Sequence, residues 1–209
     1  MIIKLIFWNY KLSSNPHISG IELNLSCPNI IGKPQIGYDF EAMDNLLKEV
    51  KAVIHSPTIT FGVKMPPYFD ISHWETSAKI LNHYDLDFIT CINSLGNGLV
   101  IDTESESVVI KPKNGFGGIG GIGIKPIALS NVNKFYRLTN SSIIGCGGIR
   151  NGEDAFHHIL AGASAIQIGT QFKSEGFGCF KRILNELAEI MERKKYGNIL
   201  DFRGKLNSI

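Results

Sequence analysis

The chain has 209 residues, of which 44% are hydrophobic and 19% charged, and its formal net charge is +2. This composition is typical of a soluble protein with a hydrophobic core, and the scattered Lys and Arg residues form no basic stripe of the kind that nucleic-acid binding requires. The four cysteines form no Cys-x-x-Cys pair and no histidines have metal-ligand spacing, so we expect no zinc site, no disulfide framework and a cytoplasmic location.

The N-terminal residues 1–8 are apolar, but Lys4 interrupts them and the run is too short to span a bilayer. No small-residue cleavage site follows. We therefore interpret this segment as stray or structural rather than as a signal peptide, and we expect no membrane association.

From residue 21 onward, short apolar runs alternate with amphipathic helical stretches. The pattern predicts a buried strand over 21–26 and further strands over 58–64, 87–92, 142–146 and 165–168. It predicts helices over 39–54, with Asp39 as the N-cap, and over 72–83, 126–138, 152–161 and 177–194. The long connection between residues 93 and 123 should carry its own structure, with 108–112 as a strand of a small surface sheet.

Five strand–helix units in a row predict an α/β fold with a parallel sheet covered by helices. Right-handed crossovers place the carboxyl ends of all five strands on one side, where the sequence has mostly Asn, Lys and Gly. Single residues of these types often do no more than form turns, but five such strand ends favour a site. A closed barrel needs eight units, so the chain is either an open α/β sheet or about the last five units of a TIM (β/α)8 barrel.

Two consecutive strands end in glycine-containing pairs, Gly147-Gly148 and Gly169-Thr170, and each pair precedes a predicted helix. Glycines let backbone N–H groups approach an anion, and the last two loops of a β/α barrel are its usual phosphate site. The glycine run 115–121 fits either a third phosphate contact or a flexible hinge.

Cys27 and Lys64 are the candidate reactive side chains. Cys27 follows a strand within Asn24-Leu-Ser-Cys-Pro-Asn29, where a stabilised thiolate could accept a proton, although most cysteines are buried and inert. Lys64 ends its strand and should point into the barrel mouth, where it could offset negative charge on a bound ring. The neighbouring strand ends offer no acidic partner for Lys64, which favours a ligand.

The chain from about residue 20 to 209 resembles the dihydroorotate dehydrogenases, most closely the soluble, fumarate-dependent class 1A. The matching stretches are Glu22–Asn29, Gly32–Gln35, Tyr38–Phe40, Phe61–Pro67, Thr90–Ser94, Gly96–Gly98, Lys111–Lys113, Gly145–Gly148, Gly152–Ala155, Leu160–Ala163 and Asp201–Lys205. The membrane-bound class has serine in place of Cys27, and the class with an iron–sulfur partner resembles Gly32–Gln35 less closely.

This resemblance implies an enzyme of pyrimidine biosynthesis in which Cys27 removes a proton from C5 of dihydroorotate while hydride passes from C6 to FMN. It implies that Asn24, Asn29, Asn93 and Ser94 hold the substrate. It assigns FMN binding to Asn24, Lys64, Ile92, Gly121, Gly147, Gly148, Gly169 and Thr170, with Lys64 beside the N1/O2 edge of the flavin. Fumarate as electron acceptor and a homodimer are implied as well.

Family members begin with three further β/α units, and residues 1–19 do not resemble the family. We therefore expect a non-family segment at 1–19 and a barrel part at 20–209, with an inserted β segment near 94–123. An inactive fragment that only binds FMN or phosphate, or a related flavin-dependent pyrimidine oxidoreductase, stays open as an alternative.

Overall fold

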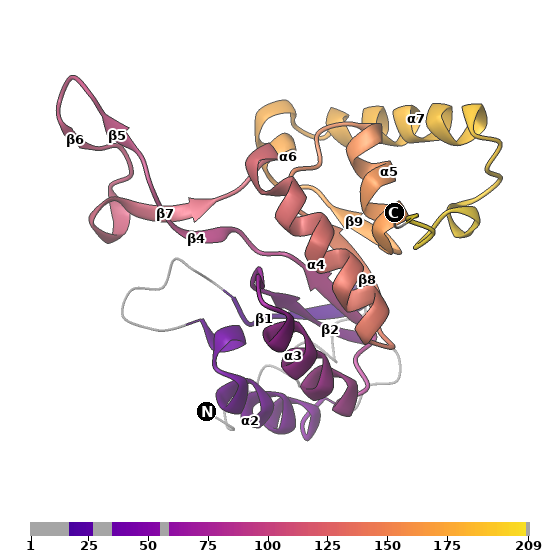
Figure 1. The fold of residues 1–209 in the computed structure, drawn as a ribbon, viewed down its shortest axis with the longest axis horizontal. Coiled ribbons are helices and arrows are strands. Elements are labelled where there is room, and N and C mark those ends of the chain that lie inside the picture. The colour runs from indigo at the N-terminus through magenta and orange to yellow at the C-terminus, as the bar shows by residue number, and fades with distance from the viewer. Residues whose placement is uncertain (1–16, 27–34, 55–58, 208–209) are drawn as a thin grey trace.

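The structure is a computed structural model that describes residues 17–26, 35–54 and 59–207. Its centre is a five-stranded sheet in which all neighbouring strands run parallel (Figure 1). In the sheet order β1-β2-β3-β8-β9 these strands are Gly20–Asn24, Thr60–Met65, Phe88–Cys91, Ser142–Cys146 and Ala165–Gln167. The order in the sheet follows the order in the chain, as predicted for successive β/α units.

A helix follows each strand, again as predicted. The helices are α2 Phe40–Lys51, α3 Ile71–His83, α4 Lys125–Leu138, α5 Gly152–Ala161 and α7 Gly178–Arg193, and the 3₁₀ turns are Ile36–Tyr38, Pro112–Gly115, Ile122–Ile124 and Ile199–Asp201. The structure adds one helix, α6 Thr170–Glu175. Because α6 buries none of its six residues, it has no apolar face and hence no helical periodicity in the sequence.

Side-chain caps fix where three of these helices begin. The Asp39 carboxylate accepts a hydrogen bond from the N–H of Ala42 at 3.0 Å, which confirms the predicted N-cap of α2. Asp70 and Asn151 cap α3 and α5 in the same way. Each cap satisfies an N–H group that would otherwise lack a partner in the first helical turn.

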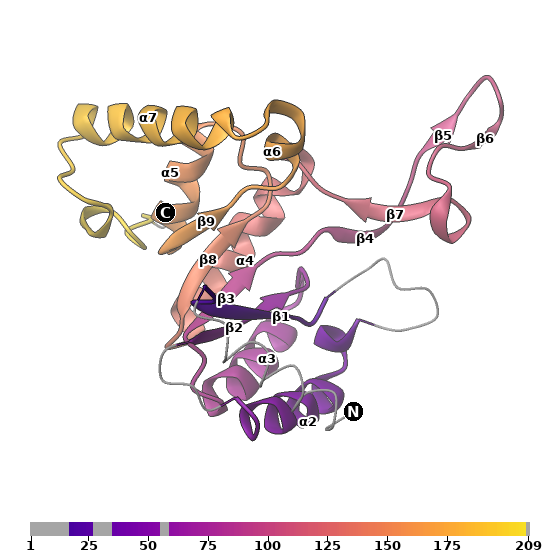
Figure 2. The same ribbon diagram turned by 180° about the vertical axis from the view of Figure 1, so that it is seen from behind.

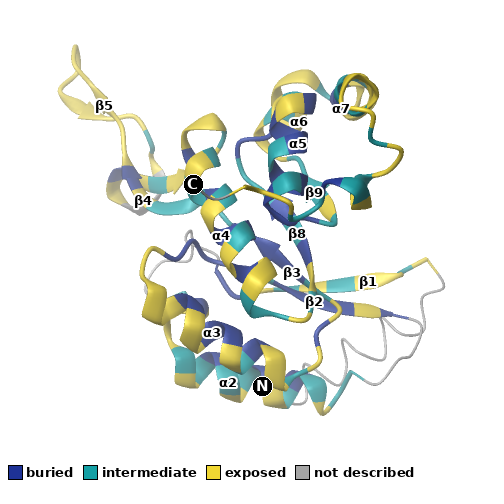
Figure 3. Ribbon diagram, turned by 45° about the vertical axis from the view of Figure 1, so that its right-hand side comes forward, coloured by how far each residue is buried: buried dark blue, intermediate teal, exposed yellow. Residues whose placement is uncertain are grey.

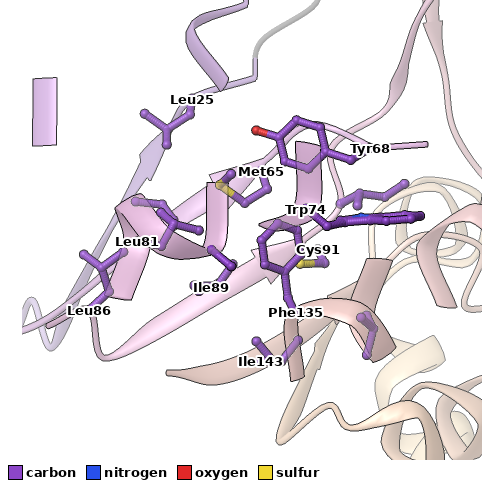
Figure 4. Packing of buried hydrophobic residues seen from close by; sticks show 14 of the residues in the cluster. Leu25, Met65, Tyr68, Trp74, Leu81, Leu86, Ile89, Cys91, Phe135 and Ile143 are labelled. Atoms are coloured by element: carbon purple, nitrogen blue, oxygen red, sulfur yellow. The ribbon is translucent and has the colours of Figure 1, made fainter. Parts of the chain in front are cut away.

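The main core lies between the sheet and helices α2, α3 and α4. Met43, Leu47 and Val50, on the predicted apolar face of α2, are buried there. Figure 4 shows side chains from strands and helices packed in one layer, among them Met65, Ile89, Cys91, Leu81 and Phe135. A second cluster between α5 and α7 comprises Ile149, Ala155, Phe156, Ile159, Cys179, Ile183, Leu187 and Phe202.

The helices cover only one face of the sheet, and Figure 2 shows the other face without a helix over it. A doubly wound sheet has helices on both faces, whereas a barrel keeps them outside and fills its interior with side chains. The arrangement is therefore that of successive units of a β/α barrel. Strand β1 was expected to be buried, and this is wrong: its residues alternate between exposed and half-buried, because β1 is an outer strand of the described sheet (Figure 3).

The connection after β3 forms an arm that projects from the body (Figure 1). Strands β4 Leu95–Leu99 and β7 Phe116–Ile119 pair antiparallel, and so do β5 Ile101–Asp102 and β6 Ser107–Val108. The expected small sheet is present, but its strand ends at Val108 and does not continue to Pro112, which has no N–H to donate. The arm exposes Leu99, Val100, Ile101, Val108, Val109, Phe116 and Ile119.

Candidate functional site

A cavity of about 320 Å³ opens at the carboxyl ends of β2, β3, β8 and β9. Parallel strands bring their carboxyl ends to one edge, so residues distant in the sequence meet there. Nine of the residues singled out from the sequence line this cavity: Lys64, Ile92, Asn93, Ser94, Gly121, Gly147, Gly148, Gly169 and Thr170. The polar and glycine residues at the predicted strand ends therefore do lie together around a cavity.

Asn24 lies next to this cavity and contacts one of its lining residues. Its Oδ1 accepts hydrogen bonds from the Asn93 side chain at 3.1 Å and from the Ser26 N–H at 3.0 Å. The Asn93 Oδ1 in turn accepts from the Ser94 N–H at 2.7 Å. Cys27 and Asn29, the other predicted residues of this loop, lie outside the described residues.

Lys64 reaches across the concave face of the sheet to β9. Its Nζ donates to Oε1 of Gln167 at 2.6 Å, and Nε2 of Gln167 donates to a carboxylate oxygen of Glu22 at 2.9 Å. The Thr90 hydroxyl donates to the same oxygen. Among the described residues Lys64 forms no direct ion pair, which agrees with the expectation, and the carboxylate of Glu22 is connected to it only through Gln167. The ammonium still lines the cavity, with two of its three donors unassigned among the described residues.

The Gly147-Gly148 pair has a backbone conformation that only glycine adopts readily. Both residues have positive φ, +133° and +74°. A Cβ on Gly148 would lie 2.5 Å from the Cβ of Lys125, and one on Gly147 would lie 2.8 Å from the Cβ of Ala128. Glycine is therefore required here for both backbone angle and space, beyond the ordinary needs of a turn.

The glycine run 115–121 divides between the arm and the site. Gly115 packs against Val108 within the arm, whereas Gly120 and Gly121 line the cavity beside Thr170. A Cβ on Gly120 would approach the Thr170 hydroxyl to 3.3 Å. Gly120 and Gly121 thus form part of the cavity wall. For these two residues a contact with a ligand is favoured over the alternative of a flexible hinge.

The two glycine-containing pairs differ in their distance from a helix N-terminus. Helix α5 begins at Gly152, as predicted, but a loop separates it from Gly147-Gly148. Helix α6 begins at Thr170 but has only six residues, too few for a strong dipole. An anion at this edge would therefore be held mainly by loop N–H groups and nearby cations.

Arg150 and Lys125 supply positive charge near the glycine loop. Arg150 lines the cavity, and the backbone N–H of Arg150 donates to Asp154 at 2.9 Å. The Lys125 ammonium contacts the other oxygen of Asp154. Burial alone would raise the pKa of Asp154, but the hydrogen bonds from Lys125 and Arg150 outweigh it and the pKa is lowered. Asp154 is therefore an ionised anchor for the loop.

Gln167, Arg150 and Gln171 also line the cavity and were not predicted from the sequence. Only their positions in the sequence could have identified them, since Gln167 ends β9 and Arg150 follows a glycine pair. Neither glutamine nor arginine at such a position indicates a binding site by itself. Cys146 lines the cavity, whereas Cys91 and Cys179 are fully buried, as is typical of inert core thiols. Burial raises the pKa of Cys91.

No cluster of three or more His, Cys, Asp or Glu side chains among the described residues is arranged to hold a metal ion. None of the described helices combines the length and apolar character needed to cross a membrane.

A parallel β/α sheet with helices on one face defines the α/β-barrel class. Two glycine loops and Lys64 line a cavity at the carboxyl edge of this sheet, where such barrels bind their ligands. Residues 7–191 match the family model described as dihydroorotate dehydrogenase. The fumarate-type dihydroorotate dehydrogenase of Trypanosoma cruzi is 59% identical over 191 residues, which are 90% of this chain and 60% of the relative. Dihydroorotate dehydrogenase A (fumarate) of Lactococcus lactis subsp. lactis is 56% identical over 202 residues, 95% of this chain and 64% of the relative.

A solved structure agrees on the fold. The crystal structure of DHODH in complex with ferulenol from Eimeria tenella matches with a TM-score of 0.72 at 22% identity, covering 90% of this chain and 54% of that chain. The chain belongs to the dihydroorotate dehydrogenase family. It spans 60% of the length of the Trypanosoma relative and 64% of the Lactococcus relative.

Proposed function

We propose that this chain carries the flavin and substrate site of a dihydroorotate dehydrogenase that oxidises dihydroorotate to orotate in pyrimidine biosynthesis, with fumarate as electron acceptor. The observation that carries the proposal is the convergence of Lys64, Asn93 and two glycine loops on one cavity. Relatives of 56 to 59% identity that are named for this reaction support it.

The residues of the cavity fit FMN. Gly147, Gly148, Gly169 and Thr170 would hold its phosphate, because all four line the cavity, the Gly148 N–H has no acceptor among the described residues, and no atom lies within 4 Å of a Cβ built on Gly169. Ile92, Gly121 and Asn24 would contact the ring system. When bound, FMN supplies the two-electron acceptor for the oxidation.

The chain's own side chains position the substrate and move its proton. Lys64 would place a positive charge beside the N1/O2 edge of the flavin. Asn24 and Asn93 already hold each other, and with Asn29 and Ser94 they would orient the pyrimidine ring and its carboxylate. Cys27 is the proposed general base for the C5 proton, a role that rests on the Asn-Leu-Ser-Cys-Pro-Asn motif.

Substitution of Cys27 tests this assignment. Cys27→Ser should lower dihydroorotate oxidation at neutral pH by about a hundredfold or more, because a serine hydroxyl ionises far less readily than a thiol and general-base catalysis contributes on the order of 10²–10⁴. FMN affinity, measured by fluorescence titration, should change less than about twofold. Oxidation at the unmutated rate in Cys27→Ser would contradict the role of Cys27.

Partners and organisation are part of the same proposal. We propose fumarate as a second ligand of the cavity and a cytoplasmic homodimer. The family match begins at residue 7, so the non-family segment expected at 1–19 would be limited to residues 1–6. The exposed apolar side chains of the arm support self-association, since a monomer rarely exposes so many together. Sedimentation equilibrium tests the dimer, which should dissociate when Val109 and Phe116 are changed to Ser.

A further inference from the structure

His158 is a buried histidine below the glycine loop, on helix α5. Its side chain has no exposed surface, and its Nε2 lies 3.0 Å from the carbonyl oxygen of Gly147. A carbonyl can only accept, so Nε2 carries the hydrogen of this bond. The other ring nitrogen, Nδ1, is buried and has no hydrogen-bond partner among the described residues.

The surroundings of His158 keep its ring neutral. Burial lowers the pKa to about 4, and the positive charge of Lys125 adds to this, while the Gly147 carbonyl and Asp154 oppose it. The charged and titratable groups that face the ring are thus Lys125 on α4 and Asp154 and His157 on α5. A neutral ring with its hydrogen on Nε2 is a fixed donor to Gly147.

That hydrogen bond determines the direction of the next N–H group. In a trans peptide the C=O and N–H point to opposite sides, so a Gly147 carbonyl held toward α5 turns the Gly148 N–H the other way. Gly147 and Gly148 both line the cavity, and the Gly148 N–H has no acceptor among the described residues. With φ of +133° and +74°, these two glycines could adopt many other conformations if nothing held them.

The remainder of the loop is fixed separately. Arg182 of α7 donates to the Arg150 carbonyl at 2.9 Å, and Glu186 accepts from the Gly152 N–H at 2.7 Å. The Arg150 N–H is bound by Asp154. Among the described side chains, His158 is the one that bonds the glycine pair itself, so no other such contact fixes that peptide.

We propose that His158 is a positioning residue, which holds the Gly147 carbonyl so that the Gly148 N–H donates to the phosphate of a nucleotide-type ligand in the cavity. This inference rests on the proposed FMN site. The proposed role differs from that of an ordinary core residue in one measurable way. Loss of the His158 hydrogen bond should weaken binding of the phosphate group and leave binding of the rest of the ligand unchanged.

The test compares the affinities of FMN and riboflavin, which differ only in the phosphate, by fluorescence titration. His158→Gln keeps an amide donor at about the position of Nε2, whereas His158→Asn places its donor near Nδ1 and cannot reach Gly147. The Asn variant should bind FMN about tenfold more weakly or worse, the scale of one hydrogen bond to a charged group, with riboflavin affinity changed less than about twofold. The Gln variant should retain most of the FMN preference.

His157, the half-exposed neighbour on the same helix, provides the matched control: His157→Asn should preserve both affinities. If His158→Asn does not fold, as judged by circular dichroism, His158→Met removes the donor without adding polarity and should show the same selective loss. An equal loss of FMN and riboflavin affinity, or no loss, would overturn the role of His158. If the unmutated protein does not prefer FMN over riboflavin, the proposed phosphate site fails and the inference fails with it.

Discussion

Gln167 and Glu22 lie 145 residues apart, yet Nε2 of Gln167 donates to Glu22 at 2.9 Å and so joins β9 to β1, the two outer strands of the sheet. In a flat sheet, four strand spacings would hold these strands about 19 Å apart. The bond therefore requires strong curvature toward the face without helices. The same amide accepts from Lys64, so the curvature of the sheet sets the position of the ammonium.

Replacement of Gln167 should release Lys64. In Gln167→Leu the ammonium loses its acceptor and its link to Glu22, so we expect dihydroorotate oxidation to slow by about tenfold, a loss of about 1.4 kcal/mol in transition-state stabilisation. Glu22→Gln is the matched control, because a glutamine can still accept from Gln167 and Thr90, and it should slow the reaction less. Equal rates in the unmutated protein and in Gln167→Leu would show that Lys64 is placed by other means.

Gly148 should not tolerate a side chain, whereas Gly169 should. Gly148→Ala combines a positive φ with a Cβ 2.5 Å from Lys125, so the free energy of unfolding should fall by about 1–3 kcal/mol. Gly169 has negative φ and nothing within 4 Å of its Cβ, so Gly169→Ala should stay within about 0.5 kcal/mol. Urea unfolding measures both, and similar losses at the two positions would contradict the difference.

Asn131 ties α4 to the loop after β2 and should be essential for stability. Its Oδ1 accepts from the Tyr68 N–H and the Trp74 indole, both at 2.9 Å, and its Nδ2 donates to the carbonyls of Tyr68 and Ile127. Asn131→Leu would leave these buried groups unpaired, at a cost of about 3 kcal/mol or more.

Asn133, on the same helix, provides the comparison for Asn131. It is half-buried, and within the described part of the chain its side chain donates only to the carbonyl of Ala161, so Asn133→Leu should cost about 1 kcal/mol. Thermal unfolding distinguishes the two variants, and equal shifts in melting temperature would refute the special role of Asn131.

The buried His158 makes stability depend on pH in a defined direction. Its pKa is about 4 in the folded protein, below the ordinary value of 6.5, so between these values the unfolded chain binds a proton that the folded protein does not. Stability therefore rises with pH across this window, and the contribution of this residue that is lost on going from pH 7 to pH 4 amounts to about 3 kcal/mol.

His158→Gln removes this titration and isolates its effect. The stability difference between the unmutated protein and this variant should shift in favour of the variant as the pH falls from about 6.5 to 4. Urea unfolding at several pH values provides the measurement. Parallel curves for the two proteins would show that the ring is not held neutral.

Local features of the sequence predicted much of the fold. The bounds of β8 and α5 agree with the prediction, because an apolar run and an Asn N-cap mark them. Helix α6 was missed because it buries no residue, and β1 was expected to be buried because apolar alternation does not reveal which strands have two neighbours.

The sequence was sufficient to predict which strand ends form the site, but not which hydrogen bonds connect its side chains. Parallel topology alone brings Lys64, Asn93 and Gly147 together, so their spacing in the sequence was sufficient. The hydrogen bonds from Gln167 to Glu22 and from His158 to Gly147 depend on sheet curvature and on helix packing. Neither can be inferred from the types of these residues.

The most direct test of the central claim is an anaerobic titration of the FMN-loaded protein with dihydroorotate, followed by the flavin's visible absorbance and by orotate formation. We expect the absorbance to disappear with one orotate formed per FMN, and fumarate to restore it. FMN that binds but keeps its absorbance in excess dihydroorotate, or a protein that binds no FMN, would contradict the assignment.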